Sequence, residues 1–307
     1  RDDLVTGVQT CALPIFKIHP LISAEQQLKE IEGIIQNALR EDIGSGDHST
    51  LACIPTSARG KAALLVKESG YISGLEFAQK VFAALSQDIV FEPLQEDGAY
   101  AEKGSIAFTV EGPSHILLQA ERLVLNAMQR MSGITTKTRA YVAQLEGTKT
   151  RLLDTRKTTP GIRALEKWAV RLGGGVNHRF ALYDAIMLKD NHIDFCGGMD
   201  QAILATKNYL KQHEFNLPII VEARDFDEIK AILKHNGITR ILIDNFSIKD
   251  TKKAVALIGD HCQTESSGMI NLQTIRDYAL CGVDFVSCGA ITHSVQNLDL
   301  SLKAIND

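Results

Sequence analysis

Helical spacing of apolar residues is the first pattern along the chain. Ser23 followed by Gln26 is a capping arrangement for the start of a helix. Apolar residues then recur at intervals that suit one helix face, namely Leu28, Ile31, Ile34, Ile35 and Leu39. The pattern predicts a helix that ends at the turn-rich segment 41–47.

Short apolar runs and two further helical stretches follow. Residues 62–66 and 106–110 are predicted strands, and residues 76–85 between them are a predicted helix. A long helix is predicted over residues 117–139, where apolar side chains recur at helical spacing. This part of the chain therefore predicts an α+β domain.

After about residue 149 the pattern changes to short apolar strands that alternate with helical stretches. The predicted strands are 151–153, 185–188, 218–221, 240–243 and 284–287. Such alternation is typical of parallel βαβ units. Polar or charged residues directly follow each strand, where the active site of an α/β barrel lies. A doubly wound sheet would normally carry an early Gly-rich fingerprint, which the sequence lacks, so we expect a barrel.

Composition narrows the class of protein. Hydrophobic residues make up 45% and charged residues 23%, which is typical of a soluble globular enzyme. The net charge of −4 provides no general attraction to nucleic acid or to a membrane. The six cysteines form no C-x-x-C pair, so we expect free thiols in a reducing cytoplasm. Residues 1–15 show no periodicity and no signal-peptide pattern, and we interpret them as a non-native leader.

Basic residues concentrate in one region. Residues 151–189 hold eight basic and three acidic residues, a local charge of +5. Arg163, Lys167 and Arg171 recur every fourth residue, and we expect them on a solvated helix face. The others of interest fall in predicted loops or at strand ends: Arg156, Lys157, Arg179 and Lys189. Such cations meeting at a barrel mouth predict a site for a small polyanion.

Two acids, Glu222 and Asp244, lie at neighbouring predicted strand ends. A single carboxylate there is as often structural as functional. Two beside a basic cluster indicate ligands for a divalent ion such as Mg²⁺, or groups that stabilise a cationic reacting centre.

Two turns that contain glycine follow the last strands, 266–268 (S-S-G) and 287–290 (S-C-G-A). Small residues there let backbone N–H groups approach a phosphate, so both are predicted phosphate sites. The triple glycine at 173–175 lacks the Lys and Ser/Thr of a P-loop. We interpret it as a flexible connection and exclude nucleoside triphosphate binding there.

Three histidines are candidates for the site. His178 precedes Arg179, whose charge disfavours a second cation, so a neutral hydrogen-bonding or positioning role is expected. For His192 and His293 a structural role is the simpler interpretation.

Several strings together resemble the quinolinate phosphoribosyltransferase family. They are 41–47 (E-D-I-G-S-G-D), 121–126 (E-R-L-V-L-N), 154–161 (D-T-R-K-T-T-P-G), 177–179 (N-H-R), 185–192 (A-I-M-L-K-D-N-H), 221–222 (V-E), 244–245 (D-N) and 292–294 (T-H-S). The similarity extends over about residues 28–304. The D-T-R-K-T-T-P-G and L-K-D-N-H strings are the most specific.

The resemblance implies a fold and an assembly. It implies an amino-terminal α+β domain over 16–127, onto which 294–307 packs back. Residues 128–293 would form an incomplete α/β barrel with fewer than eight strands. The family resemblance also implies a homodimer in which Arg122 reaches the active site of the partner subunit.

The resemblance further implies the activity and its residues. A pyridine dicarboxylate, quinolinate, would react with phosphoribosyl pyrophosphate and Mg²⁺, with loss of CO₂. Arg122, Arg156, His178, Arg179 and Lys189 would bind the carboxylates, whereas Lys157, Glu222 and Asp244 would be catalytic and face the ribose, pyrophosphate and metal. The remaining implied substrate contacts, several of them at the phosphate turns, are Thr155, Ser266, Ser267, Gly268, Ser287, Cys288, Gly289 and His293.

Two departures from the family and three alternatives stay open at this point. The family usually has a second glycine after Ser267-Gly268, where this chain has Met269, and residues 262–264 before the turn are not apolar. The substrate could be nicotinate or another acidic heterocycle. Lys189 could form a Schiff base in a lyase or aldolase. The chain could also be a non-catalytic anion-binding or dimerisation module.

Overall fold

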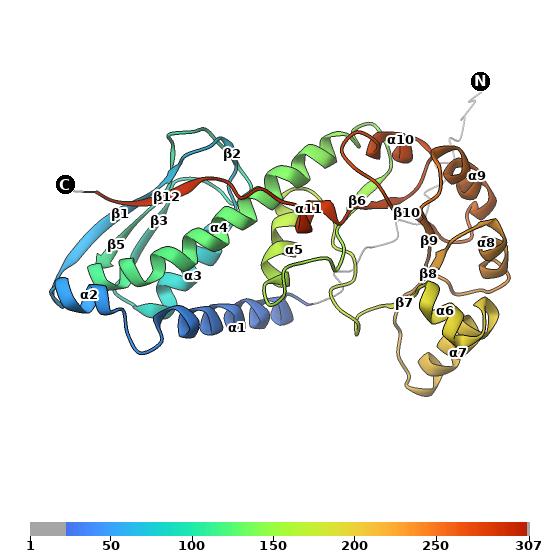
Figure 1. Cartoon of the computed structure of the whole chain (residues 1–307), viewed down its shortest axis with the longest axis horizontal. Coiled ribbons are helices and arrows are strands. Elements are labelled where there is room, and N and C mark those ends of the chain that lie inside the picture. The colour runs from blue at the N-terminus through green and yellow to red at the C-terminus, as the bar shows by residue number, and fades with distance from the viewer. Residues whose placement is uncertain (1–22, 306–307) are drawn as a thin grey trace, which may run out of the picture.

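The computed structural model describes residues 23–305, and the predicted leader at 1–15 lies outside them. The molecule is elongated, with one sheet at each end and the long helix α4 (Ser114–Ala143) running from beside the first sheet toward the middle (Figure 1). No helix within residues 23–305 combines the length and the apolar character that crossing a bilayer requires.

The predicted first helix is confirmed. It is α1 (Ala24–Ile43), and the Ser23 hydroxyl accepts a hydrogen bond from the Gln26 backbone N–H as the capping pattern requires. The helix extends into the predicted turn segment before it ends at Gly44. Asp47 then caps the short helix α2 (His48–Cys53) by accepting a hydrogen bond from Thr50 N–H.

The amino-terminal domain is built on an antiparallel sheet in the order β12-β1-β5-β3. Its strands are β1 (Arg59–Val66), β3 (Val90–Pro93), β5 (Ile106–Pro113) and β12 (Leu300–Ile305). A small separate ladder joins β2 (Gly70–Tyr71) to β4 (Tyr100–Ala101). The chain's last strand, β12, thus pairs with its first, β1. The domain boundaries themselves stay a prediction.

A single core joins this sheet to its helices. The helix α3 (Leu75–Leu85) and α4 pack together, and Phe82 and Phe108 meet edge to face with ring centroids 6.3 Å apart. The same core continues through α5 (Arg163–Leu172) to strand β11 (Phe285–Ser287). The α+β prediction for this part of the chain is confirmed.

The second domain holds a parallel sheet of six strands in the order β6-β11-β10-β9-β8-β7. Besides β11, the strands are β6 (Arg151–Leu153), β7 (Ile186–Leu188), β8 (Ile219–Ala223), β9 (Arg240–Asp244) and β10 (Gln263–Ser267). The sheet is not closed, because β6 and β7 are its two edges. This agrees with an incomplete barrel of fewer than eight strands.

Short helices follow the strands and cover them. They are α6 (Asp190–Cys196), α7 (Met199–Gln212), α8 (Phe226–Ile232), α9 (Ile248–Ile258), α10 (Ile275–Leu280) and α11 (Ala290–His293). A second core of apolar side chains fills the space between β7, β8, β9 and the helices α7 to α9. Because all six strands run the same way, their carboxyl ends meet at one edge of the sheet.

Strand β10 is the one barrel strand that the apolar pattern missed. Its sequence is Q-T-E-S-S, yet Thr264, Glu265 and Ser266 are all buried. Polar partners replace apolar contacts there: Thr264 bonds to Asp284, and Glu265 pairs with Arg240. A search for apolar runs cannot detect such a strand.

Candidate active site

A cavity of about 770 Å³ opens at the carboxyl ends of the six strands. The predicted site residues that line it are Thr155, Arg156, Lys157, His178, Arg179, Lys189, Glu222, Asp244, Ser267, Gly268, Ser287, Cys288, Gly289 and His293. Arg156, Arg179 and Lys189 thus share one cavity, as a polyanion site requires.

Two predicted residues do not line this cavity. Arg122 is exposed on α4, away from the cavity of its own chain. Ser266 is buried in β10 beside the lining residue Ser267, because successive side chains of a strand point to opposite faces. The Ser266 hydroxyl has no hydrogen-bond partner among the described residues.

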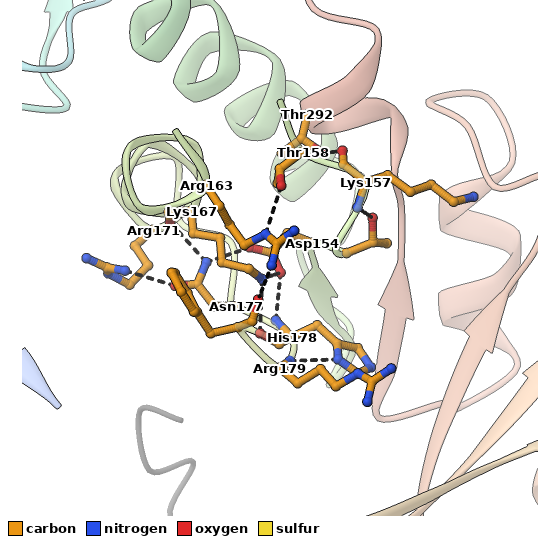
Figure 2. Close-up of polar contacts among 12 residues, drawn as sticks. Asp154, Lys157, Thr158, Arg163, Lys167, Arg171, Asn177, His178, Arg179 and Thr292 are labelled. Carbon is orange, nitrogen blue, oxygen red and sulfur yellow. Dashed lines mark hydrogen bonds and ion pairs between the residues drawn. The ribbon is translucent and has the colours of Figure 1, made fainter. Parts of the chain in front are cut away.

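A buried polar network fixes the loop after β6. The Lys167 ammonium lies 2.5 Å from Asp154 Oδ1 and donates to the backbone carbonyl of His178 at 3.0 Å. Asp154 also accepts from Asn177 Nδ2 at 2.6 Å and from His178 N–H at 2.7 Å. One carboxylate thereby ties segment 154–157 to segment 177–179. In Figure 2, Lys157 and Arg179 extend away from this network toward the sheet.

The prediction that Lys167 lies on a solvated helix face is wrong. Its side chain is 1% exposed, and burial lowers its pKa while Asp154 opposes that shift. Burial likewise raises the pKa of Asp154, and Lys167 opposes it. Arg163 donates to Thr158 and to the carbonyl of Phe180, and Arg171 donates to Asn177. Only Lys167 is buried; Arg163 is partly buried and Arg171 is exposed.

The triple glycine at 173–175 is part of the packing. A Cβ at Gly173 would lie 2.5 Å from the Thr138 Cβ on α4, and one at Gly175 would lie 2.7 Å from Val170. The glycines let this segment pass close to α4 and α5. The prediction of a loosely flexible connection is therefore wrong.

Another buried acid, Glu166, supports the same loop from α5. Its carboxylate accepts from the Thr159 backbone N–H at 3.1 Å and pairs with Arg130 of α4 at 2.9 Å. Thr292 donates to the carbonyl of Lys157 at 2.8 Å. The tips of Arg156 and Lys157 remain exposed above this support.

His178 and Arg179 are both buried at the cavity wall. His178 Nδ1 accepts a hydrogen bond from the Arg179 backbone N–H at 2.7 Å, and Arg179 Nη1 donates to the Ala185 carbonyl at 3.1 Å. Burial and the charge of Arg156 lower the pKa of Arg179. A partly desolvated guanidinium of this kind is suited to a carboxylate partner.

Two acids line the same cavity from the neighbouring strands β8 and β9. Glu222 sits inside β8, one residue before its end, and Asp244 is the last residue of β9. Burial raises the pKa of Glu222, Asp244 raises it further, and Lys189 opposes the shift. Two adjacent carboxylates in this state favour a cationic ligand.

The two acids fit a magnesium ion that arrives with a substrate. Between residues 23 and 305, no group of three or more His, Cys, Asp or Glu side chains is arranged to hold a metal. Magnesium needs no such cage, since one or two carboxylates, substrate phosphates and waters complete its shell.

The turn after β10 is tightly built. Gly268 has φ +91°, and a Cβ there would lie 2.0 Å from Asn245 Oδ1. Met269 adopts φ +50°, a left-handed conformation that is rare outside glycine, and its side chain is 84% exposed. The chain therefore keeps the turn although it lacks the family's second glycine.

The turn after β11 brings three predicted residues together. A Cβ at Gly289 would lie 3.0 Å from both Lys157 Cδ and His293 Cδ2. His293 lines the cavity and pairs with the Ser294 hydroxyl at 2.7 Å. His192 instead accepts from the Lys189 backbone N–H at 3.1 Å, which confirms a structural role.

Sequence reasoning missed several lining residues. They are Met187, Asp190, Leu242, Asn245, Glu265 and Ile270. Glu265 is the most informative, because it is a fully buried acid. Its position two residues before Ser267 puts both on one strand face, a signal that recognising β10 would have given.

Comparisons with known proteins agree with this geometry. Residues 134–303 match the family model described as quinolinate phosphoribosyl transferase, C-terminal domain, and residues 47–132 match its N-terminal domain. The chain is 39% identical to quinolinate phosphoribosyltransferase [decarboxylating] 1b of Nicotiana tabacum, over 89% of this chain and 82% of that protein.

A bacterial relative and a solved structure give the same result. The chain is 35% identical to the probable nicotinate-nucleotide pyrophosphorylase [carboxylating] of Bacillus subtilis, over 89% of this chain and 93% of that protein. The crystal structure of NadC from Streptococcus pyogenes superposes with a TM-score of 0.83 at 36% identity, covering 93% of this chain and 99% of that one. This chain belongs to the quinolinate phosphoribosyltransferase family.

Proposed function

We propose that this chain transfers the phosphoribosyl group of phosphoribosyl pyrophosphate to quinolinate and releases pyrophosphate and CO₂. The product would be nicotinate mononucleotide, a step toward NAD. Family membership and a cavity lined by basic residues together with the acids Glu222 and Asp244 support the proposal.

Quinolinate binding falls to the cationic side. Arg156, Arg179 and Lys189 share the cavity with His178, and a planar dicarboxylate needs donors for two carboxylates. The loop network fixes the backbone of segments 154–157 and 177–179 before substrate arrives, so Arg156, His178 and Arg179 need little further ordering to bind it. A monocarboxylate would leave some of these donors without a partner.

The transfer step falls to the acidic side. The ring nitrogen of quinolinate forms a bond to C1 of the ribose as the bond from C1 to the pyrophosphate oxygen breaks. Positive charge grows on the ribose at that moment, and the negative charges of Glu222 and Asp244 stabilise it. Lys157 stabilises the leaving pyrophosphate.

Magnesium would be held by Glu222 and Asp244 together with the substrate's oxygens, and it would neutralise charge on pyrophosphate. The turns at Ser267-Gly268 and Gly289 offer backbone N–H groups for the 5-phosphate. Both turns line the cavity, which supports this placement.

Decarboxylation needs only orientation from the protein. The bond between the ring and the 2-carboxylate breaks, its electron pair flows toward the positively charged ring nitrogen, and a proton takes the place of CO₂. No side chain acts as a nucleophile in this scheme.

We also propose a homodimer and a cytoplasmic location. Arg122 lies outside its own chain's cavity, so a role in substrate binding requires a second copy to receive it. Its exposed position on α4 supports that arrangement.

The shared cavity of Arg156, Arg179 and Lys189 carries the proposal. The test incubates the chain with quinolinate labelled in its 2-carboxylate, phosphoribosyl pyrophosphate and magnesium. Labelled CO₂ and one pyrophosphate per CO₂ are expected. Nicotinate is the control substrate. Faster pyrophosphate release with nicotinate than with quinolinate, or no release with either, would contradict the proposal.

A further inference from the structure

Glu265 is a buried acid that the scheme above leaves without a role. It lies in β10, is fully buried and lines the cavity floor. Its Oε2 accepts from Arg240 Nη1 at 2.8 Å, whereas its Oε1 has no hydrogen-bond partner within residues 23–305. A buried carboxylate oxygen without a donor is costly, so a nearby donor is expected.

His178 supplies the matching unpaired donor. Its Nδ1 accepts from the Arg179 backbone N–H, so in the neutral imidazole the proton is on Nε2. Nε2 is buried, lies 3.4 Å from Glu265 Oε2, and makes no hydrogen bond of ordinary geometry to any described residue. An unpartnered donor therefore lies beside a carboxylate whose nearer oxygen, Oε2, already accepts from Arg240 and whose other oxygen, Oε1, has no partner among the described residues.

We propose that Glu265 is a positioning residue for quinolinate binding, because its carboxylate takes the Nε2–H of His178. The ring is then held in one tautomer and one orientation, and Nδ1 holds the backbone of Arg179. Such contacts are often long without ligand and tighten in the complex. The effect on quinolinate rests on the proposed function, whereas the tautomer of His178 does not.

A buried carboxylate next to a dicarboxylate site would repel the substrate unless a cation neutralised it, and Arg240 is that cation. It neutralises Glu265 at 2.8 Å, and its guanidinium lies 4.0 Å from the ring centroid of Phe285. Burial raises the pKa of Glu265, but the hydrogen bond from His178 and the charge and hydrogen bond of Arg240 lower it. The carboxylate is therefore ionised and ready to accept a hydrogen bond at neutral pH.

The first test reads the tautomer of His178 directly. The full chain is labelled with ¹⁵N-histidine, and the His178 signal is identified by its loss in His178→Asn. The wild type is expected to show protonated Nε2 and unprotonated Nδ1, and Glu265→Gln to shift the Nε2 resonance. The reverse tautomer, or identical His178 signals in wild type and Glu265→Gln, would overturn the proposal. This readout needs no catalytic activity.

The second test measures quinolinate affinity by calorimetry in a double-mutant cycle. Glu265→Gln is expected to weaken binding roughly 10-fold, as loss of a hydrogen bond to a charged group does. His178→Asn keeps an acceptor near Nδ1 but lacks Nε2–H. If Glu265 acts through His178, the double variant binds about as weakly as the weaker single variant. Strictly additive losses would refute that connection.

Asp284→Asn is the matched control. Asp284 accepts hydrogen bonds from Thr264, the residue before Glu265 in β10. Asp284 does not line the cavity. Its substitution is expected to lower stability and leave quinolinate affinity unchanged. Equal losses of affinity in Asp284→Asn and Glu265→Gln would reduce Glu265 to a structural residue. No binding by the wild type would contradict the proposed function, while the tautomer test would still decide the role of Glu265.

Discussion

The cationic and acidic sides of the cavity are built in opposite ways. On the cationic side, the buried pair Asp154–Lys167 and its hydrogen bonds fix two loops before any ligand is present. On the acidic side, Glu222 and Asp244 take their positions from adjacent parallel strands, and Glu222 is electrostatically unfavourable there.

This difference indicates how each side uses binding energy. The cationic side is preorganised: Asp154 and Lys167 neutralise each other inside the protein, whereas the buried guanidinium of Arg179 donates to a backbone carbonyl and keeps its charge for a ligand. The acidic side keeps charges that only a cation can neutralise. We infer that the first side recognises a rigid anion and that the second responds to a charge that arrives or develops during the reaction.

The largest predicted effect comes from breaking the support of the cationic side. Lys167→Met leaves Asp154 as a buried, unpaired charge, which should lower the free energy of unfolding by about 3–5 kcal/mol. Chemical denaturation measures the change. Lys149→Met is the matched control, because Lys149 is exposed and its pair with the partly exposed Asp284 at 2.9 Å should contribute less than about 1 kcal/mol. Equal losses of unfolding free energy in the two variants would contradict a special role of the buried pair Asp154–Lys167.

The next prediction concerns the acidic side. Glu222→Gln keeps the size of the side chain but removes a charge that faces the developing cation. Turnover should fall about 10²–10³-fold, as when one preorganised electrostatic group is lost. Steady-state rates of pyrophosphate release measure it. Asp250, a partly exposed acid at the start of α9 and outside the cavity, is the control: Asp250→Asn should leave turnover unchanged. A similar rate in Glu222→Gln and wild type would contradict a catalytic role.

A pH dependence should arise beneath the cationic side. The pKa of Glu265 is lowered from 4.5 to about 2, so its ionised form stabilises the fold above the unfolded-state value. That contribution is about 3 kcal/mol at neutral pH and is lost as pH falls from about 4.5 through about 2. The stability difference between wild type and Glu265→Gln should therefore shrink on acidification. A stability difference between the two proteins that stays constant from pH 7 to pH 3 would contradict this pH dependence.

The smallest effect is expected at the turn beside Asp244 and Asn245. Met269 has φ +50°, so Met269→Gly should relieve strain and raise the free energy of unfolding by about 0.5–1 kcal/mol. Glu214, at φ +53° after α7 and outside the cavity, is the matched control and should gain a similar amount when changed to glycine. Lower stability of Met269→Gly alone would show that its side chain makes stabilising contacts.

Much of the fold could be predicted from local patterns. The strands β6, β7, β8, β9 and β11 are apolar, and they were found to within one or two residues. Strand β10 was missed because its buried residues are polar, and two of them, Thr264 and Glu265, bond to Asp284 and Arg240, which lie elsewhere in the sequence.

The site residues divide in the same way into those that local sequence predicts and those that depend on distant partners. Residues placed by strand ends or by specific strings, such as Arg156, Lys189 and Asp244, were predicted and line the cavity. Lys167 was misplaced and Glu265 was overlooked, because each is determined by a partner that only the fold brings near. Periodicity shows which residues share one face of a helix or strand, but it does not show which residues of other elements contact that face.

The most direct test of the division of labour is the affinity for quinolinate alone, without phosphoribosyl pyrophosphate or magnesium. Arg179→Ala should weaken binding about 10- to 100-fold, since a hydrogen bond between charged groups contributes about 1.5–3 kcal/mol. Glu222→Gln should bind quinolinate as well as the wild type or better. Equal weakening in both variants, or undiminished affinity in Arg179→Ala, would contradict the assignment of the dicarboxylate to the cationic side.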